Sequence, residues 1–343
     1  MTALLDLSIL IVNWNSRDFL RKCLASIYAG TRTLSFEVIV VDNASFDGAG
    51  EMVAAEFPQV RFIQSKSNLG FARANNLAFE HSNGRVALLL NPDTEVIGDA
   101  LAKMFRAVES LPDAGIVSCK LLNTDGTIQT AGVKRFPTIL GEVLSIEWLR
   151  TRWPDCSLWS IGLLFSESSN PVPVDAVGGA CQMIPRDVYQ AVGGLNPKYF
   201  MYVEDIEISA SALALGKKTY YVGGAEIIHH GGQSSTGKDR GSRWVAIMQK
   251  EAMWQFFRHS RGEAYAAVYR ATIAIVSLLW LLAATILSPL LYLLRGGAGI
   301  VRVWRKWLGS LQWSLGLQNL TNKFPGQVSA HSAQASSAVS DSR

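Results

Sequence analysis

Apolar runs alternate with helical patterns in the first hundred residues, and this alternation limits the possible folds more than any other feature. Runs rich in Val, Ile and Leu lie at residues 7–15, 36–45, 60–65 and 86–94. Helical periodicity lies between them at residues 17–29, 49–57 and 71–81. Strands that are apolar throughout are typical of a parallel sheet covered by helices on both faces. We therefore predict an α/β fold with a mostly parallel sheet.

Polar residues follow each of these apolar runs at the point where the strand should end. Single turns of this composition are common, because Asn, Asp and Gly favour loops. Open α/β sheets, however, bind ligands at the carboxyl ends of their strands, so four such clusters predict one crevice. Its candidate residues are Asn13, Asn15, Asp42, Asn68, Asn91 and Asp93.

A second informative block covers residues 174–235. It predicts a strand that contains a glycine pair, a helix, a loop, a helix that begins near Glu204, and a strand that ends on His229 and His230. The stretch at residues 148–170, which is rich in Trp and Ser, matches no element, and a flexible loop over the site is one interpretation.

Composition excludes some classes of protein. A hydrophobic content of 49% with 17% charged residues is enough for a sizeable core in a chain of 343 residues. The net charge of +4 is small and spread along the chain, so we expect no nucleic-acid partner. The four cysteines form no C-x-x-C pair, and residues 1–7 lack the basic start of a signal peptide. We therefore expect reduced thiols in a cytoplasmic domain.

Residues 271–294 carry no charge and would form a helix of about 36 Å, long enough to cross the apolar core of a membrane. Basic residues flank the segment on both sides, so charge does not fix its orientation. Pro289 and the amphipathic residues 301–313 also allow a re-entrant or in-plane arrangement. We predict a catalytic domain at 1–262, membrane-associated helices at 263–321 and a disordered tail at 322–343.

The strand-end residues suit a ligand that bears a diphosphate. Its charge requires a divalent cation, Mg²⁺ or Mn²⁺, which takes oxygen ligands mostly from phosphate and water, so Asp93 alone is a sufficient carboxylate. Asp42 could accept hydrogen bonds from a ribose or base. Gly70 precedes a predicted helix whose first amides favour anions, with Arg73 close by. Neither a P-loop nor a G-x-G-x-x-G motif is present in these contexts.

Six motifs occur together in one order: "SILIVNWNS", "VVDNAS", "NLGFARANN", "LLLNPDT", "GGACQMIPRDVYQAVGGLNPKYFMYVEDIE" and "IIHHGGQSS". As a set they resemble the family 2 glycosyltransferases of the GT-A fold. More narrowly, they resemble the bacterial rhamnosyltransferase-like and galactofuranosyltransferase-like group that builds cell-surface polysaccharide. The resemblance covers about residues 7–261.

The resemblance implies a role for each matching residue. Asp205, with Glu204 beside it, matches the catalytic base, although the pair could also be a helix N-terminal acidic cap. Asp93 matches the metal-binding position, and His229, or alternatively His230, matches a further metal or diphosphate contact. The implied donor site comprises Asn13, Asn15, Asp42, Asn68, Gly70, Arg73, Asn76, Asn91 and Asp93. The implied acceptor and sugar pocket comprises Gly178, Gly179, Ala180 and Tyr202.

Two positions depart from the family pattern. Ser211 stands where an arginine is usual, and Glu207 replaces the more usual Asp, which leaves the contacts to an acceptor phosphate in question.

The expected activity is a metal-dependent, inverting transfer of a sugar, with rhamnose as the first expectation. The donor would be a dTDP- or UDP-sugar and the acceptor lipid-linked or polysaccharide, at the cytoplasmic face of the inner membrane. Two alternatives remain: a nucleotidyltransferase that makes nucleotide sugars, and a non-catalytic, membrane-anchored binding module.

Overall fold

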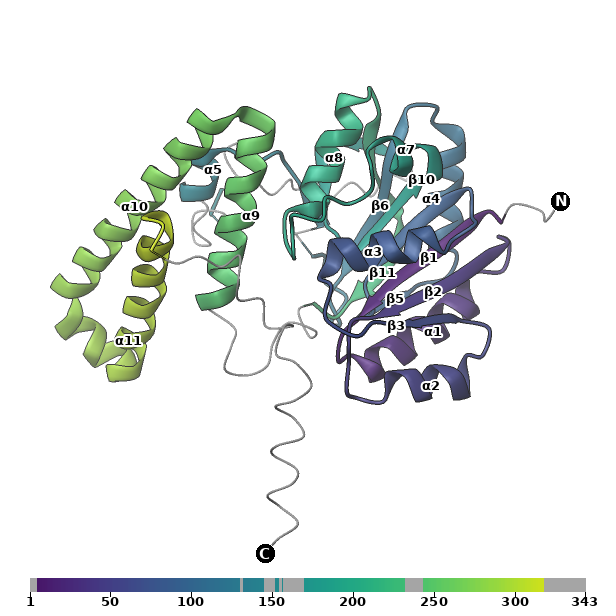
Figure 1. The fold of residues 1–343 in the computed structure, drawn as a ribbon, viewed down its shortest axis with the longest axis horizontal. Coiled ribbons are helices and arrows are strands. Elements are labelled where there is room, and N and C mark those ends of the chain that lie inside the picture. Colours follow the sequence, from purple (N-terminus) through teal and green to yellow (C-terminus); the bar gives the residue numbers. More distant parts are fainter. Residues whose placement is uncertain are drawn as a thin grey trace, which may run out of the picture.

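The computed structural model describes residues 5–129, 132–144, 152–153, 156, 170–231 and 243–317. It consists of an α/β domain built on one large sheet and a group of long helices beside it (Figure 1). Most of the 148–170 stretch and all of the predicted disordered tail lie outside the described residues, so those two predictions stay untested.

The large sheet is mixed rather than parallel throughout. Parallel pairs join β1 to β2 and β4, β2 to β3, and β6 to β11, whereas β10 is antiparallel to β4 and β6, and β5 and β8 are antiparallel to β11. The α/β prediction is confirmed, but a strand buried between two neighbours is apolar whichever way it runs, so the sequence did not reveal these directions. The strands, in sheet order, are β3 (Arg61–Gln64), β2 (Phe36–Asp42), β1 (Leu7–Asn13), β4 (Val86–Leu90), β10 (Cys181–Pro185), β6 (Ala114–Leu122), β11 (Lys218–His229) and β5 (Thr94–Val96), with β8 (Val172–Val174) beside β11.

Helices cover both faces of this sheet, because successive strand residues point to opposite sides. Ile9 and Ile11 belong to one core cluster, whereas Leu10 and Val12 belong to another. The first cluster is closed by α1 (Arg17–Gly30), α2 (Ala49–Glu56) and α4 (Ala100–Ser110), and the second by α3 (Phe71–Glu80), α7 (Arg186–Ala191) and α8 (Glu204–Ala214). The predicted helices at 17–29, 49–57 and 71–81, and the one from Glu204, are confirmed.

A third apolar cluster joins the α/β domain to the long helices. It contains Tyr199 and Val203 from the loop before α8 and Ile206 from its first turn, together with residues of three long helices. These helices are α9 (Arg243–Arg261), α10 (Glu263–Ile286) and α11 (Ser288–Ser314). Smaller elements lie between the two parts: the antiparallel pair β7 (Val133–Lys134) and β9 (Ala176–Val177), and the helix α5 (Ile139–Leu144).

The uncharged segment at residues 271–294 does not form the single helix that the sequence predicts. The helix α10 ends at Ile286, and α11 begins at Ser288 with Pro289 in its first turn. Proline lacks an amide hydrogen and clashes with the preceding turn, which explains why one helix ends here and another begins. Within the described residues, only Glu263–Ile286 is long and apolar enough to cross a membrane, by length and composition.

Gly70 allows the loop before α3 to pack against the loop before α8. It adopts a left-handed backbone (φ 79°), and a Cβ atom there would lie 2.7 Å from the Phe200 carbonyl oxygen. The Phe71 amide donates to that same carbonyl at 2.9 Å, so the two loops are held directly together.

We expect Gly70→Ala to lower the free energy of unfolding by about 2–4 kcal/mol, from roughly 1 kcal/mol of backbone strain and 1–3 kcal/mol of overpacking. The matched control is Gly98→Ala, because Gly98 also has a positive φ (54°) but nothing lies within 4 Å of its added Cβ. This control should lose only about 1 kcal/mol. Equal losses in chemical denaturation would contradict the packing role of Gly70.

Candidate active site

Asp42 is the buried centre of the first strand-end cluster. The pairing of β1 with β2 places Asn13 opposite Asp42, and the pairing of β2 with β3 places Gln64 on its other side. Asn13 Nδ2 donates to Asp42 Oδ2 at 2.8 Å, while the Ser45 amide and Gln64 Nε2 donate to Oδ1 at 2.7 and 2.8 Å. Asp42 is 1% exposed, and its carboxylate retains one free acceptor position, on Oδ2.

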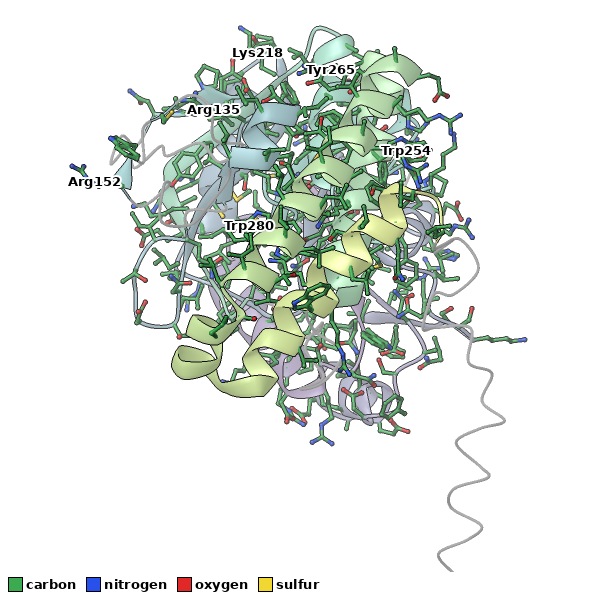
Figure 2. All side chains as sticks on the ribbon, turned by 90° about the vertical axis from the view of Figure 1, so that its left-hand side faces the viewer. Arg135, Arg152, Lys218, Trp254, Tyr265 and Trp280 are labelled. Atoms are coloured by element: carbon green, nitrogen blue, oxygen red, sulfur yellow. The ribbon has the colours of Figure 1, made fainter. Side chains whose placement is uncertain are left out.

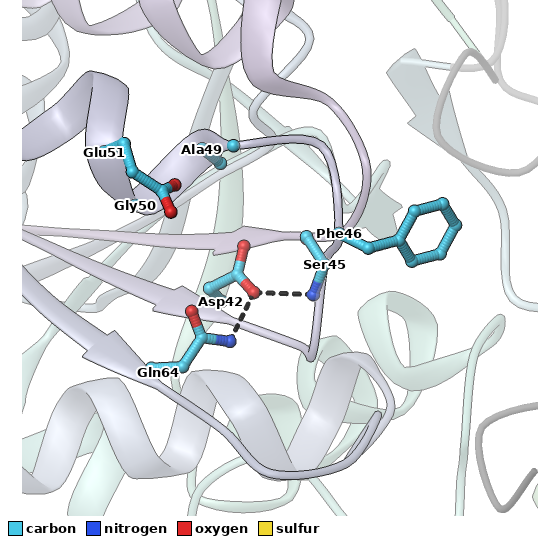
Figure 3. A pocket seen from close by; sticks show the side chains of 8 residues that line it. Asp42, Ser45, Phe46, Ala49, Gly50, Glu51 and Gln64 are labelled. Carbon is cyan, nitrogen blue, oxygen red and sulfur yellow. Dashed lines mark hydrogen bonds between the residues drawn. The ribbon is translucent and has the colours of Figure 1, made fainter. Parts of the chain in front are cut away.

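A hollow of about 190 Å³, open to solvent, lies over Asp42 (Figure 3). Phe46 stands at its edge with its ring pointing outward, 88% exposed. Asn15 shapes this turn, since its Oδ1 accepts from the Phe46 amide at 3.1 Å and its own amide donates to Ser45 Oγ at 2.8 Å. An exposed aromatic ring beside a buried carboxylate is a suitable platform for a planar ligand. Phe46 was absent from the sequence-based site, although an aromatic residue inside the polar turn "NASFDG" was a usable signal.

The next strand-end loop presents the start of α3. Asn68 Oδ1 accepts from the Gly70 amide at 2.9 Å, and Asn43 of the neighbouring loop bonds both the Leu69 amide and the Gly70 carbonyl at 3.3 Å. Arg73, in the first turn of α3, is exposed and makes no hydrogen bond or ion pair with the described residues. This guanidinium is therefore free to meet an anion.

The side-chain amide of Asn76, which was predicted to contact the donor, is engaged by other residues of the protein. Its Nδ2 donates to the Leu195 carbonyl at 2.7 Å, and its Oδ1 accepts from the Tyr189 hydroxyl at 2.7 Å and the Leu195 amide at 2.9 Å. These bonds hold the loop after α7 against α3 and occupy the amide group. The structure therefore corrects the prediction of a donor contact and gives Asn76 a structural role.

Asp93 and His229 face one another at a separate point of the same edge. The antiparallel pairing of β5 with β11 sets His229 opposite Thr94, and His229 Nε2 lies 3.5 Å from Asp93 Oδ1. That oxygen is buried and has no hydrogen-bond partner, an unusual state for a carboxylate. Gln129 Oε1 lies 2.9 Å from His229 Nδ1, and Gln129 Nε2 donates to the His229 carbonyl at 2.6 Å. With the ring proton on Nδ1, Nε2 offers a lone pair toward Asp93.

His230, the alternative ligand, is engaged elsewhere. Its Nε2 lies 2.7 Å from Glu95 Oε1, and its ring packs 5.0 Å from that of Phe19. Only its backbone amide reaches the site, where it donates to the Asp93 carbonyl at 2.9 Å. Across the part of the chain that the structure describes, no three His, Cys, Asp or Glu side chains gather as a metal site. Asp93 and His229 are thus a candidate metal site of two residues, and the side chain of the predicted Asn91 is half-buried.

Asp205 lies at the start of α8, where Lys134 and the glycine loop hold it. Lys134 Nζ forms an ion pair with Asp205 Oδ2, and the Gly179 amide donates to the same oxygen at 3.0 Å. A Cβ on Gly179 would touch Asp205, so a small residue fits closely there. The Ala180 carbonyl accepts from the Asn91 amide at 2.9 Å, and this loop therefore connects Asp205 with the end of β4.

Glu204 has a raised pKa and an unpaired buried oxygen, and the two residues before it have left-handed backbones. Burial, with the neighbouring charge of Asp205 as the second cause, raises the pKa of Glu204 to about 8. Its Oε2 atom is buried without a hydrogen-bond partner. Tyr202 and Val203 both adopt left-handed backbones, with φ values of 75° and 70°. Strain of this kind persists only where the surroundings impose it, and it often marks functional segments.

Two residues of the predicted acceptor pocket, Gly178 and Tyr202, take structural positions. The Gly178 amide donates to the Gly132 carbonyl at 2.9 Å, and Tyr202 packs against the third apolar cluster. Glu207 accepts from Asn196 Nδ2 at 3.4 Å, and burial raises its pKa. Ser211 is half-buried on the same helix, so α8 carries no cation at that position.

Lys134 and Gln129 were absent from the sequence-based site. Each contacts its functional partner over a long sequence distance, 71 residues for Lys134 to Asp205 and 100 residues for Gln129 to His229. Their segment lies between β6 and β9 and carries no motif, so only the folded chain reveals them.

The sheet, the polar residues at its strand ends and the carboxylate at the start of α8 form the arrangement expected of a GT-A glycosyltransferase. Residues 8–164 match the family model "Glycosyl transferase family 2". This match covers just under half of the chain, and together with the curated relatives below it supports a glycosyltransferase of the family 2 type.

Curated relatives include two enzymes of glycan synthesis. The N-acetylglucosaminyl-diphospho-decaprenol L-rhamnosyltransferase of Mycobacterium tuberculosis is 26% identical over 272 residues, 74% of this chain and 85% of the relative. The low-salt glycan biosynthesis hexosyltransferase Agl10 of Haloferax volcanii is 30% identical over 213 residues, 60% of this chain and 61% of the relative. These matches place the chain near the rhamnosyltransferases and hexosyltransferases of the family.

A solved structure supports the fold. The mannosyltransferase PcManGT from Pyrobaculum calidifontis, in complex with GDP-Man and Mn²⁺, aligns with a TM-score of 0.54 and 17% identity. The alignment covers 94% of this chain and 89% of that one. The GT-A-like architecture expected from the resemblance is thereby confirmed.

We expect His229→Ala to weaken Mn²⁺-dependent binding of dTDP or UDP by at least about tenfold, because it removes one of the two candidate cation ligands. Calorimetric titration with and without Mn²⁺ measures this. His230→Ala is the matched control and should bind normally, since its side chain is engaged by Glu95. A loss in His230→Ala with normal binding by His229→Ala would reverse the assignment.

The raised pKa of Glu204 predicts how stability depends on pH. Between the ordinary value of 4.5 and about 8, the folded chain keeps a proton that the unfolded chain has lost. This contribution to stability therefore falls as pH rises through that window. We expect Glu204→Gln to melt at a higher temperature than wild type at pH 8, with a smaller difference at pH 5.

The matched control for this prediction is Glu80→Gln, because Glu80 is exposed at the end of α3. This variant should follow the wild-type dependence on pH in thermal melts. A Glu204→Gln difference that shrinks toward pH 8 would show that Glu204 is ionised in the folded chain.

Proposed function

We propose that the chain is an inverting, metal-dependent glycosyltransferase of cell-surface glycan synthesis. It moves a rhamnose-like sugar from a dTDP- or UDP-sugar to a lipid-linked or polysaccharide acceptor, at the cytoplasmic face of the cell membrane. The observation that carries this proposal is the buried, unpartnered Asp93 oxygen that faces His229, joined through the glycine loop to Asp205.

The residues present fit a divalent cation. A buried carboxylate oxygen without a hydrogen-bond donor, 3.5 Å from a ring nitrogen, is an arrangement that a cation would satisfy. Asp93 and His229 would hold Mg²⁺ or Mn²⁺, with the donor's phosphate oxygens and water as the other ligands. When bound, the ion would stabilise the charge of the leaving nucleoside diphosphate.

The nucleoside binds over Asp42 in this proposal. The free acceptor position on Asp42 Oδ2 matches the single imide N–H of uracil or thymine, and Phe46 offers its exposed ring to the planar group. The diphosphate then extends toward Asp93, past the first turn of α3, where the exposed Arg73 and the positive end of the helix favour its negative charge. This path explains why the polar residues lie at successive strand ends.

Asp205 acts as the general base. It takes the proton of the acceptor hydroxyl while that oxygen bonds the anomeric carbon, and the bond from this carbon to the phosphate oxygen breaks. Attack on the face opposite the leaving group inverts the configuration. Lys134 and the Gly179 amide hold the carboxylate in position, and Glu204, neutral near pH 7, adds no second negative charge.

The relatives support a sugar and an acceptor class. One is named as a rhamnosyltransferase that acts on a diphosphate-linked lipid, and another as a hexosyltransferase of glycan biosynthesis. We therefore place rhamnose first and UDP-linked hexoses second. A membrane-bound acceptor also agrees with the apolar helix α10 next to the catalytic domain.

The two alternatives are less well supported. The family model and the two relatives described above favour sugar transfer over the synthesis of nucleotide sugars, because both relatives are named as sugar transferases. A non-catalytic module would not need the ion pair and glycine contact that fix Asp205.

We expect Asp205→Asn to lower the rate of sugar transfer by about 10²–10⁴-fold, the usual contribution of a general base, while donor binding is retained. Transfer assays and calorimetric titration of the nucleotide measure the two quantities separately. Asp187→Asn is the matched control, because Asp187 lies in the first turn of α7 and is exposed. Unchanged turnover in Asp205→Asn would exclude it as the base.

A further inference from the structure

The helices α10 and α11 form an antiparallel hairpin with an apolar outer surface. Figure 2 shows the two helices side by side, in front of the other described elements, with Trp280 on α10. In a water-soluble chain these side chains would be an unusually large apolar surface. The exposed apolar residues toward the hairpin's turn are Ile275, Leu278, Leu279, Leu282, Ile286 and Leu287.

The base of the hairpin is fixed to the catalytic side. Trp313, near the end of α11, donates through Nε1 to Glu251 Oε2 of α9 at 2.8 Å. Its carbonyl accepts from Arg270 of α10 at 2.9 Å, and its ring packs edge-on against Tyr269. The beginning of α10 and the end of α11 are therefore held next to each other and next to α9.

The part of α10 that lies beyond its first, protein-packed turns is shorter than the hydrocarbon core of a bilayer. Ala266 and Tyr269 are buried in the third apolar cluster, so the start of α10 is occupied by protein contacts. From residue 271 to its end at Ile286, α10 measures about 24 Å, at 1.5 Å per residue. The hydrocarbon core of a typical bilayer is about 30 Å thick. A length of 24 Å exceeds one leaflet but does not reach across both.

The charges on α11 also argue against a crossing of the bilayer. This helix carries four cationic residues, which are costly in the bilayer interior. It could not stay outside while α10 crossed, because the Trp280 and Trp307 rings stack at 5.4 Å with an interplanar angle of 5°. Tryptophan favours the level of the lipid headgroups, and Lys306 Nζ lies 5.4 Å from the Trp307 ring centre, as expected where apolar and anionic groups meet. The cations are Arg295, Arg302, Arg305 and Lys306.

We propose that the α10–α11 hairpin enters a single leaflet of a lipid bilayer and returns, with both of its ends on the side of the catalytic domain. The stacked tryptophans lie at headgroup level, Arg305 and Lys306 beside Trp307 meet anionic lipids, and Leu282, Ile286 and Leu287 reach the acyl chains. This inference rests on the proposed membrane association and specifies its form. It replaces a membrane-spanning α10 with a hairpin that does not cross.

The hairpin also fixes the height of the catalytic base above the lipid. Val203 and Ile206 flank the acidic pair on α8 and pack in the same cluster as Tyr269, Ile273 and Trp313 of the hairpin. An acceptor whose lipid part stays in that leaflet would then present its sugar close to Asp205. A chain that crossed the membrane would need no such rigid attachment.

Cysteine labelling in membranes distinguishes the two arrangements. Glu263→Cys and Leu317→Cys mark the two ends of the hairpin, Leu282→Cys marks its apolar part, and Cys156→Ser removes the one native thiol among the described residues that is not buried. The full chain, expressed in bacteria, is treated with a membrane-impermeant maleimide in intact spheroplasts and in inverted inner-membrane vesicles.

We expect both end positions to react only in inverted vesicles and Leu282→Cys to react in neither preparation. Reaction of Leu317→Cys in spheroplasts, with Glu263→Cys reacting only in inverted vesicles, would show that α10 spans the membrane and would overturn the hairpin. Reaction of Leu282→Cys in inverted vesicles would show that the hairpin does not enter lipid, and would also overturn it.

Vesicle flotation provides a second, independent measurement. The wild-type chain should float with vesicles of phosphatidylethanolamine and phosphatidylglycerol, and the double variant Leu282→Lys, Ile286→Lys should not. Leu213→Lys, at an equally exposed leucine near the end of α8, is the control and should float. Flotation of the double variant would contradict the proposal. Sugar transfer is assayed separately, so failure of the hairpin and failure of the proposed reaction are distinguishable.

Discussion

The candidate active site depends on the short antiparallel pairing between β5 and β11. Three residue pairs bring His229 next to Thr94, and the His230 amide then bonds the Asp93 carbonyl at 2.9 Å. The Ser26 hydroxyl of α1 accepts from the Val96 amide at 2.9 Å and fixes β5 from the other side. Without this pairing, the two candidate cation ligands, which are far apart in the sequence, would not meet.

The start of α8 is the second segment on which the site depends. Asp205 turns toward β7 and the glycine loop, whereas Val203 and Ile206 pack toward α9 and α10. The left-handed backbone of Tyr202 and Val203 makes this division possible, and the apolar contacts supply the energy that holds it. One short segment thus links the chemistry of the crevice to the helices that we place in lipid.

Sequence reasoning predicted the strand ends well, because Asn or Asp directly after a buried strand must lie at the edge of the sheet where that strand stops. Asp42, Asp93 and His229 lie where their motifs place them, within one edge of the sheet. Asn76 was misassigned because proximity to Gly70 in the sequence does not determine which face of α3 a side chain occupies. Lys134 could not be foreseen, since its partner lies 71 residues away.

The helices at the C-terminal side show a different limit. On hydropathy alone, the whole uncharged segment was predicted to form one helix, although Pro289 already indicated a break within it. Hydropathy also cannot show that α10 spends its first turns in contact with α9, because those contacts involve the same apolar residues that lipid would accept. The burial of these first turns therefore favours a hairpin that enters one leaflet over a helix that spans the membrane.

The most direct test of the cation site is a crystal structure with Mn²⁺ and dTDP or UDP, in which the anomalous signal locates the metal. We predict one manganese peak bound by Asp93 Oδ1, His229 Nε2 and the diphosphate, with the nucleoside over Asp42. A nucleotide bound with its manganese away from both side chains would contradict this assignment.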